Sequence, residues 1–315
     1  LREHHSFARQ RHREEYLIRK MNPARNRGRV VSTRMFTSAL NSIVSNKNGR
    51  RIFRPRPISY GMNPRNKRGR EISFIEKLLS EKYHLFDASA AARDTGRILR
   101  GEPLDYVIGW TPFLDLTVDL SLRPFIPRPE TEYWAGEAIK ELQKRFQGRS
   151  VEILDIFSGS GCIGVAVLKH IPKGRVTFAE KTPRFVRQIK INLIKNKLPA
   201  RRYRVCRSDL FSNVKGQFDV ILANPPYVGA INHLDSEVRK YEPRVAYYGG
   251  RNGLSAIKRF LREARRFVKP GGEIWMEFGA SQKTAIRGIL RRLGYGSFLF
   301  RRDQYRRPRY VVIRI

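Results

Sequence analysis

The segment best suited to chemistry is an Asn-Pro-Pro-Tyr motif, made of Asn224, Pro225, Pro226 and Tyr227. It follows an apolar run that has the pattern of a buried strand. Two consecutive prolines fix the backbone and lack N–H donors, so nearby carbonyl oxygens stay available as acceptors. The Asn224 side-chain oxygen and the Pro225 carbonyl can accept both hydrogens of a planar –NH₂ group. We therefore expect these four residues to be catalytic, although a proline-rich turn that merely ends the strand is the alternative.

A turn containing two glycines lies upstream and has the pattern of a cofactor site. Asp155 lies near the end of an apolar run, and Ser158, Gly159 and Gly161 follow it before the next apolar run. Glycines let the backbone turn tightly and approach a ligand over the strand end. Glu180 ends the next predicted strand, where a carboxylate can accept hydrogen bonds from both ribose hydroxyls. A dinucleotide-binding fold is the alternative, but the glycine spacing gives no clear role for a pyrophosphate.

A glycine turn followed by Asn-Pro-Pro-Tyr is typical of methyl transfer, so we expect S-adenosylmethionine as the cofactor. Asn224 lies close enough in this arrangement to contact it as well. Asp209 follows the third predicted strand, where its carboxylate can bind the exocyclic amine of an adenine. The neighbouring Ser208 and Asp209 are also common residues at helix N-termini, and the sequence leaves these two interpretations equal.

From residue 151 onward, short apolar runs alternate with amphipathic stretches, which indicates β-α units around a parallel sheet. The expected strands are Val151–Phe157, Arg175–Glu180, Arg204–Arg207, Phe218–Ala223 and Glu273–Phe278. Helices are expected over 162–170, 183–195, 253–268 and 281–293. The last two segments, 296–301 and 310–315, alternate without a helix between them and predict an antiparallel pair. This is the plan of a class I, seven-stranded, Rossmann-like α/β methyltransferase.

Three regions are expected along the chain. Residues 1–72 mix Arg, Asn, Gly and Pro with few acids, which predicts a basic, largely extended arm with one helix at Glu14–Met21. Residues 73–115 predict a small helical domain and a linker, with one helix around Ile75–Leu79 and a second over Ala88–Leu99. The methyltransferase domain is expected over 116–315.

The charge of the chain indicates a polyanionic partner. Lys and Arg number 64 against 28 acidic residues, for a formal charge of +36. This excess points to RNA, with ribosomal RNA or the ribosome as the expected partner of the basic arm. A general Arg and Lys bias is the alternative. The two cysteines are too few for a disulfide framework or a zinc site, no metal is expected, and no stretch has the length of a membrane span.

Several segments resemble the HemK/PrmC family, the release-factor glutamine-N5 methyltransferases, over roughly residues 72–315. Residues 101–109 resemble the family's linker between domains, and residues 125–132, Phe-Ile-Pro-Arg-Pro-Glu-Thr-Glu, resemble its most specific signature. Residues 241–244 and 269–273 also match family segments. The resemblance implies that substrate binding involves the following residues of this signature segment: Pro127, Arg128, Pro129, Glu130 and Thr131.

The resemblance further implies S-adenosylmethionine as the methyl donor and a peptide-chain release factor as the substrate, modified on the glutamine of its Gly-Gly-Gln motif. A glutamine carboxamide offers the planar –NH₂ that the Asn-Pro-Pro-Tyr motif suits. Four features depart from the family pattern. The glycine turn has one glycine fewer, and Lys181 places a cation next to Glu180. The other two concern Phe157 and residues 1–72. Phe157 stands where a small residue is usual, so its ring either narrows the cofactor pocket or folds back into the core. Residues 1–72 have no counterpart.

We expect the protein to work in the mitochondrial matrix, because an organellar translation system needs its own enzyme. The chain begins at Leu1, and we expect that an organellar presequence has been removed. Two other functions remain open from the sequence. One is a methyltransferase-like component of the mitochondrial ribosome that binds ribosomal RNA through its basic surfaces. The other is methylation of an RNA base or a ribosomal protein, because Asn-Pro-Pro-Tyr also serves adenine-N6 chemistry.

Overall fold

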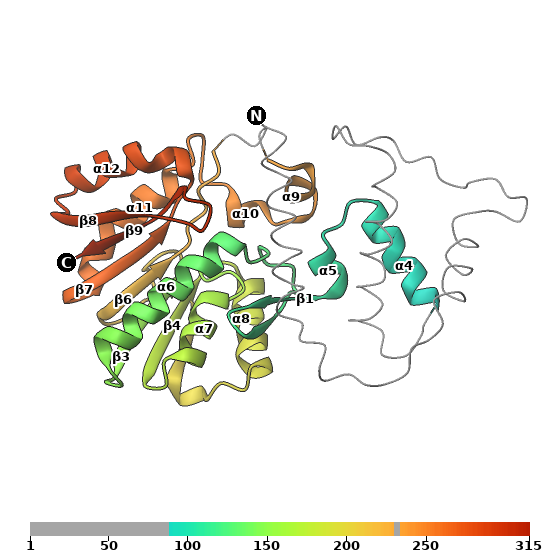
Figure 1. Cartoon of the computed structure of the whole chain (residues 1–315), viewed down its shortest axis with the longest axis horizontal. Coiled ribbons are helices and arrows are strands. Elements are labelled where there is room, and N and C mark those ends of the chain that lie inside the picture. The colour runs from blue at the N-terminus through green and yellow to red at the C-terminus, as the bar shows by residue number, and fades with distance from the viewer. Residues whose placement is uncertain (1–87, 230–233) are drawn as a thin grey trace, which may run out of the picture. The chain divides into compact units, whose positions relative to one another are not determined.

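The structure is a computed structural model that describes residues 88–229 and 234–315 (Figure 1). Contacts divide the chain into two units, Leu1–Gly96 and Arg97–Ile315. The predicted arm, its helix at 14–21 and the helix around 75–79 lie outside the described residues. Helix α4, Ala88–Leu99, confirms the second predicted helix of the N-terminal region. The predicted domain boundaries stay predictions.

A mixed sheet forms the centre of the second unit. Within the described residues it has seven strands in the order β5-β4-β3-β6-β7-β9-β8, and β9 is antiparallel to both β7 and β8. This order confirms the expected class I plan with its closing antiparallel pair. The strands are β3 (Val151–Ile156), β4 (Gly174–Glu180), β5 (Tyr203–Arg207), β6 (Phe218–Ala223), β7 (Val268–Glu277), β8 (Ser297–Arg302) and β9 (Pro308–Arg314).

Helices cover both faces of this sheet (Figure 1). Alternate residues of each strand point to opposite faces, so one strand contributes to two cores. Ile153 packs in the core under α6, α7 and α8, while its neighbour Leu154 packs in the core under α11 and α12. The helices of the second unit are α5 (Leu104–Ile108), α6 (Pro129–Phe146), α7 (Cys162–His170), α8 (Pro183–Lys195), α9 (Ser236–Tyr241), α10 (Arg244–Tyr247), α11 (Ser255–Glu263) and α12 (Lys283–Arg292).

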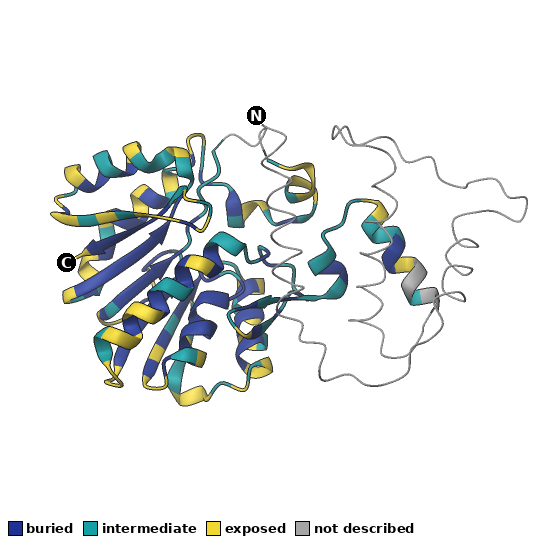
Figure 2. Cartoon of the chain, viewed as in Figure 1, coloured by how far each residue is buried: buried dark blue, intermediate teal, exposed yellow. Residues whose placement is uncertain are grey.

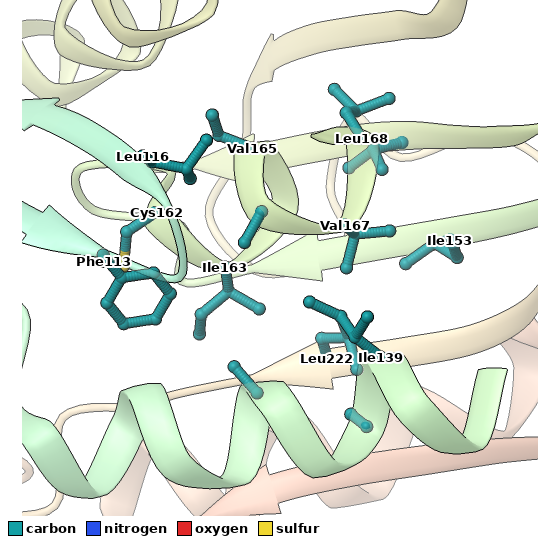
Figure 3. Close-up of a cluster of buried hydrophobic side chains, with 14 of the residues drawn as sticks. Phe113, Leu116, Ile139, Ile153, Cys162, Ile163, Val165, Val167, Leu168 and Leu222 are labelled. Carbon is teal, nitrogen blue, oxygen red and sulfur yellow. The ribbon is translucent and has the colours of Figure 1, made fainter. Parts of the chain in front are cut away.

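The core under α6 and α7 is apolar and fully enclosed. Figure 3 shows Ile139 of α6, Ile153 of β3 and Leu222 of β6 packed against α7. The central strands β3 and β6 are largely buried, while the outer faces of the helices are exposed (Figure 2). Because the strands beneath are buried on both sides, they are held firmly and can position residues at their ends.

Helix α6 and a short hairpin were not expected from the sequence. Strands β1 (Trp110–Phe113) and β2 (Leu116–Asp119) pair antiparallel. The two residues between them, Leu114 and Asp115, have φ angles of 43° and 62°. Such two-residue turns usually contain Asn or Gly, so this sequence lacks the ordinary hairpin signal. Helix α6 begins at a proline, which is favoured at the first helical position.

Two buried amide side chains of α8 attach this hairpin to the sheet domain. The Asp119 backbone N–H donates to Asn192 Oδ1 at 2.6 Å, and the Leu122 N–H donates to Gln188 Oε1 at 2.8 Å. Asn192 also donates through Nδ2 to the Ser160 carbonyl at 2.9 Å. One buried asparagine therefore links the hairpin to the glycine turn at residues 157–161.

Candidate active site

The predicted site residues gather at the carboxyl edge of the parallel strands, where open α/β sheets bind ligands. Asp155 lies near the end of β3, and Glu180 ends β4. Asn224 directly follows β6. Glu277, which was not predicted as a site residue, ends the neighbouring β7. The fold thus brings four polar side chains from four strands to one edge.

The glycine turn, residues 157–161, is held by short internal hydrogen bonds. The Ser158 hydroxyl donates to the Asp155 carbonyl at 2.7 Å, and the Gly161 N–H donates to the Ser158 carbonyl at 2.7 Å. Gly159 and Gly161 have φ angles of 56° and 79°, in the region that favours glycine. A Cβ on Gly161 would lie 3.1 Å from the Ile189 side chain. Gly161 therefore gives helix α7 its close approach to α8.

The partly buried Phe157 ring packs against the core beneath α11. Its ring meets Phe260 edge to face, with the ring centroids 5.8 Å apart. Phe260 belongs to the core beneath α11. Of the two outcomes open from the sequence, the structure shows the second. Phe157 has a φ of 60°, a conformation that costs a non-glycine residue roughly 1 kcal/mol, and the aromatic contact offsets part of this cost.

Asp155 is a buried carboxylate with one oxygen unpaired. Its Oδ2 accepts a hydrogen bond from the Gly164 N–H at 3.0 Å, while its Oδ1 is buried without a partner among the described residues. Burial raises the pKa of Asp155 to about 7, the Gly164 N–H opposes this rise, and the charge of Glu180 adds to it. A Cβ on Gly164 would lie 2.8 Å from Oδ2, so only glycine fits there. An unpaired buried acceptor fits the ammonium group of S-adenosylmethionine.

Cofactor affinity is expected to rise with pH and to level off above about pH 7. The raised pKa keeps Asp155 protonated below that pH, whereas a cationic ligand favours the carboxylate, so binding releases a proton. Below the pKa of Asp155, the affinity for the cofactor should increase by roughly tenfold per pH unit. Titration calorimetry across this range measures it, and Asp155→Asn should remove the dependence. An equally steep slope in Asp155→Asn would assign the effect to another group.

Glu180 binds two backbone amides around the proposed ribose position. Its Oε2 accepts the Gly159 N–H at 2.9 Å, and its Oε1 accepts the Thr182 N–H at 2.7 Å. Each carboxylate oxygen can accept a second hydrogen bond, so both remain able to receive a ribose hydroxyl. Glu180 thus connects the end of β4 to the glycine turn, beside which it was expected to bind the ribose.

Asp209 lies beside the site but is held by cations. The Lys181 Nζ is 3.0 Å from its Oδ2, and the Arg259 Nη2 is 3.4 Å from the same atom. The hydrogen bond from Lys181 holds the pKa of Asp209 below its usual range. The residues after Asp209 form a turn and no helix. Its contact with the adenine amine stays a prediction.

The Asn-Pro-Pro-Tyr motif is fixed at both ends. The Asn224 Nδ2 donates to the Thr131 Oγ1 at 3.3 Å, and the Tyr227 hydroxyl donates to Glu277 Oε1 at 2.9 Å. Burial raises the pKa of Tyr227, and the Glu277 charge adds to this, so its hydroxyl remains a donor. A Cβ on Gly253 would lie 2.1 Å from the Tyr227 carbonyl. The motif therefore has little freedom to move.

The signature segment lies at the start of α6. Arg128 precedes the helix and Pro129 is its first residue. The Arg128 guanidinium forms an ion pair with the buried Glu242, which also accepts the Ile126 N–H at 3.1 Å. Burial opposes the charge of Arg128, but Glu242 holds its pKa above the usual range. Arg128 thus anchors the segment to the loop before α10, and its predicted contact with substrate stays a prediction.

The structure brings the signature segment into contact with the Asn-Pro-Pro-Tyr motif, which is distant in the sequence. Thr131 of the signature segment contacts Asn224, 93 positions away in sequence. Glu277 and Gly164, which bond to Thr131 and Asp155, were missed. For Glu277 a signal existed, because it is an acid near the end of the predicted strand Glu273–Phe278, as Asp155 and Glu180 are of theirs. Among the described residues, no group of three His, Cys, Asp or Glu is placed to hold a metal ion.

This fold and this edge of the sheet define a class I, S-adenosylmethionine-dependent methyltransferase. Residues 138–239 match the Methyltransferase small domain family. The fold also matches the catalytic domain of hMettl16 in complex with MAT2A 3'UTR hairpin 6, with a TM-score of 0.52 at 12% identity over 77% of this chain and 91% of that one. Within 88–229 and 234–315, no helix is long and apolar enough to span a membrane.

Several relatives are release factor glutamine methyltransferases. The relative from Thermodesulfovibrio yellowstonii is 33% identical over 63% of this chain and 71% of its own length. The relative from Salmonella typhimurium is 34% identical over 65% and 72%. The relative from Mycolicibacterium smegmatis is 30% identical over 78% and 84%. The chain belongs to this family of methyltransferases.

Proposed function

We propose that the protein methylates the side-chain nitrogen of the glutamine in the Gly-Gly-Gln motif of a peptide-chain release factor. The relatives carry release factor glutamine methyltransferase as their name. The observation that carries the proposal is the hydrogen bond between Asn224 and Thr131 of the signature segment. It engages the donor end of the Asn224 amide and leaves the acceptor end to a substrate –NH₂.

The site favours reaction by positioning its substrate. A carboxamide nitrogen is a weak nucleophile, so most of the catalysis must come from orientation and exclusion of water. Asn224 Oδ1 and the Pro225 carbonyl accept the two N–H groups, and the Tyr227 ring covers the flat amide. Asp155 and Glu180 hold the cofactor, which supplies an electrophilic methyl group when bound. The Asn224 and Pro225 oxygens accept hydrogen bonds but are too weakly basic to take a proton, so the proton that the nitrogen loses passes to solvent.

Transfer of a labelled methyl group to a purified release factor tests the proposal. The unmodified factor should accept one methyl group, and a factor with Glu in place of the Gly-Gly-Gln glutamine should accept none. Ribosomal RNA and ribosomal proteins serve as competing acceptors in the same assay. Labelling of RNA in place of the factor would support adenine methylation and reject the proposal.

A second candidate function, contact with RNA, is favoured by where the cations lie. Between residues 181 and 218 the only acidic residue is Asp209, which is already paired with Lys181. Strand β5 is an edge of the sheet, and its Arg204 and Arg207 are exposed. This edge therefore offers exposed positive charge beside the proposed cofactor site, as phosphate-binding surfaces do.

The C-terminal part of the chain also has exposed arginines and few acidic residues. Arg291 and Arg292 are exposed at the end of α12, and Arg301 is exposed on β8. The only acid after residue 277, Asp303, is buried and paired with Arg309 at 3.0 Å. We propose that these faces and residues 1–72 bind ribosomal RNA in a mitochondrial translation system.

Affinity for ribosomal RNA is expected to fall steeply with salt, with a log–log slope of about −0.7 to −0.9 per phosphate contacted. Deleting residues 1–70 should flatten this slope and weaken binding, while S-adenosylmethionine binding stays intact. Filter-binding titrations at several salt concentrations measure both proteins. Superimposable curves would show that the arm makes no RNA contact.

A further inference from the structure

Glu277 is a buried acid that the proposed chemistry does not itself use. It ends β7 and is only 1% exposed. Three donors point at its carboxylate. Thr131 Oγ1 donates to Oε2 at 2.7 Å, Trp134 Nε1 donates to Oε2 at 2.6 Å, and Tyr227 donates to Oε1 at 2.9 Å. A carboxylate in such a place is costly unless it is well bonded, so its partners are strongly held.

Counting hydrogens fixes the direction of the bond between Thr131 and Asn224. Burial raises the pKa of Glu277, and the hydrogen bonds from Trp134 and Thr131 oppose this rise. The indole N–H of Trp134 can only donate to Oε2, so Oε2 is an unprotonated acceptor. Thr131 therefore gives its one hydroxyl hydrogen to Oε2. Thr131 Oγ1 can then only accept from Asn224. The Asn224 amide must present Nδ2 to Thr131, in agreement with the 3.3 Å contact. Because the amide is planar, Oδ1 lies on its opposite side.

We propose that Glu277 is a positioning residue that sets the orientation of the Asn224 amide through Thr131 and holds the Tyr227 hydroxyl in place. This inference rests on the proposed role of Asn224 as an acceptor for a substrate –NH₂. With the amide reversed, Asn224 would turn a donor toward the substrate, and two –NH₂ groups would oppose each other. The hydrogen bonds that link Glu277 to Thr131 and Thr131 to Asn224 exclude that orientation of the amide before the substrate binds.

Trp134 provides a control within the same cluster. Its indole N–H donates to the same Glu277 oxygen as Thr131, but Trp134 makes no bond to Asn224 in the described structure. Thr131→Val and Trp134→Phe each remove one donor from Oε2. If Glu277 only stabilises the fold, the two substitutions should have similar effects on kcat. A role in orienting Asn224 predicts that only Thr131→Val impairs the chemical step.

Glu277→Gln should preserve most of the activity. Trp134 can only donate, so the glutamine must turn its oxygen toward Trp134 and Thr131. Its –NH₂ then faces Tyr227, whose hydroxyl is able to accept. Thr131 still gives its hydrogen to residue 277, so the Asn224 orientation survives. Glu277→Met removes the acceptor and should lose the activity that Glu277→Gln keeps.

The test compares kcat, KM and cofactor Kd for these variants with the side-chain ¹⁵N signal of Asn224. We expect Thr131→Val to lower kcat by about 10²-fold with cofactor Kd unchanged, and to shift the Asn224 signal. Trp134→Phe should change neither kcat nor that signal. Equal losses of kcat in the two variants, or an unmoved signal in Thr131→Val, would overturn the proposal.

The spectroscopic measurement keeps this inference separate from the proposed function. It requires the folded chain and no methyl acceptor. If the native chain fails to methylate a release factor while the Asn224 signal responds only to Thr131→Val, the substrate assignment fails and the positioning role stands. If methylation occurs but the signal responds equally to both variants, the positioning role fails and the substrate assignment stands.

Discussion

Asn224→Ala should reduce kcat for methyl transfer by about 10²- to 10³-fold while leaving the Kd of S-adenosylmethionine nearly unchanged. Asn224 contacts the signature segment through Thr131, whereas Asp155 and Glu180, the proposed cofactor-binding residues, lie on other strands. Removing the amide therefore removes orientation of the nucleophile and leaves donor binding in place. Single-turnover kinetics together with calorimetry separate the two effects.

Tyr227 supplies the graded comparison for this prediction. Tyr227→Phe removes only the hydroxyl that donates to Glu277, and Tyr227→Ala also removes the ring that we propose covers the substrate. Activity should fall in the order Tyr227→Phe, Tyr227→Ala and Asn224→Ala. Unimpaired methylation in Asn224→Ala would show that another group orients the nitrogen.

Glu180→Ala should weaken S-adenosylmethionine binding by roughly 10- to 100-fold, or about 1.5–3 kcal/mol, as for loss of a charged hydrogen-bond acceptor. The substitution removes the ribose acceptor and also releases the backbone amides of Gly159 and Thr182. The glycine turn therefore loses one of its supports at the same time. Calorimetry with S-adenosylmethionine measures the loss.

Glu152→Ala is the matched control for this substitution. Glu152 lies near the opposite end of β3 and pairs with Arg175 at 3.1 Å on a partly exposed surface. Exposed pairs contribute little to stability, so cofactor affinity should not change. A similar loss of affinity in both variants would indicate a general effect of charge and would remove Glu180 from the ribose site.

The sheet could be predicted from the sequence because its strands are short apolar runs with clear limits. Phe218–Ala223 has the bounds that were expected. Strand β7 begins at Val268, earlier than predicted, and pairs with β6 from that residue. The sequence does not predict this start, because Pro270 and two glycines interrupt the apolar pattern. The hairpin of β1 and β2 escaped prediction because Leu114 and Asp115 adopt its turn without glycine.

The candidate site was predictable only in part. Residues at the ends of strands, such as Asp155, Glu180 and Asn224, follow recognisable apolar runs. The bonds between them are tertiary, and no local pattern encodes them. Thr131 and Glu277, for example, are 146 positions apart. The sequence therefore predicts the candidate groups at the strand ends but does not predict Glu277, the buried acid that accepts hydrogen bonds from Thr131 and Tyr227.

Tandem mass spectrometry of a release factor treated with the protein and S-adenosylmethionine tests the central claim most directly. We expect one methyl group on the side-chain nitrogen of the Gly-Gly-Gln glutamine. We expect none when the Asn224→Ala variant is used in place of the native protein. A methyl group on another residue, or an unmodified factor despite measured cofactor binding, would contradict it.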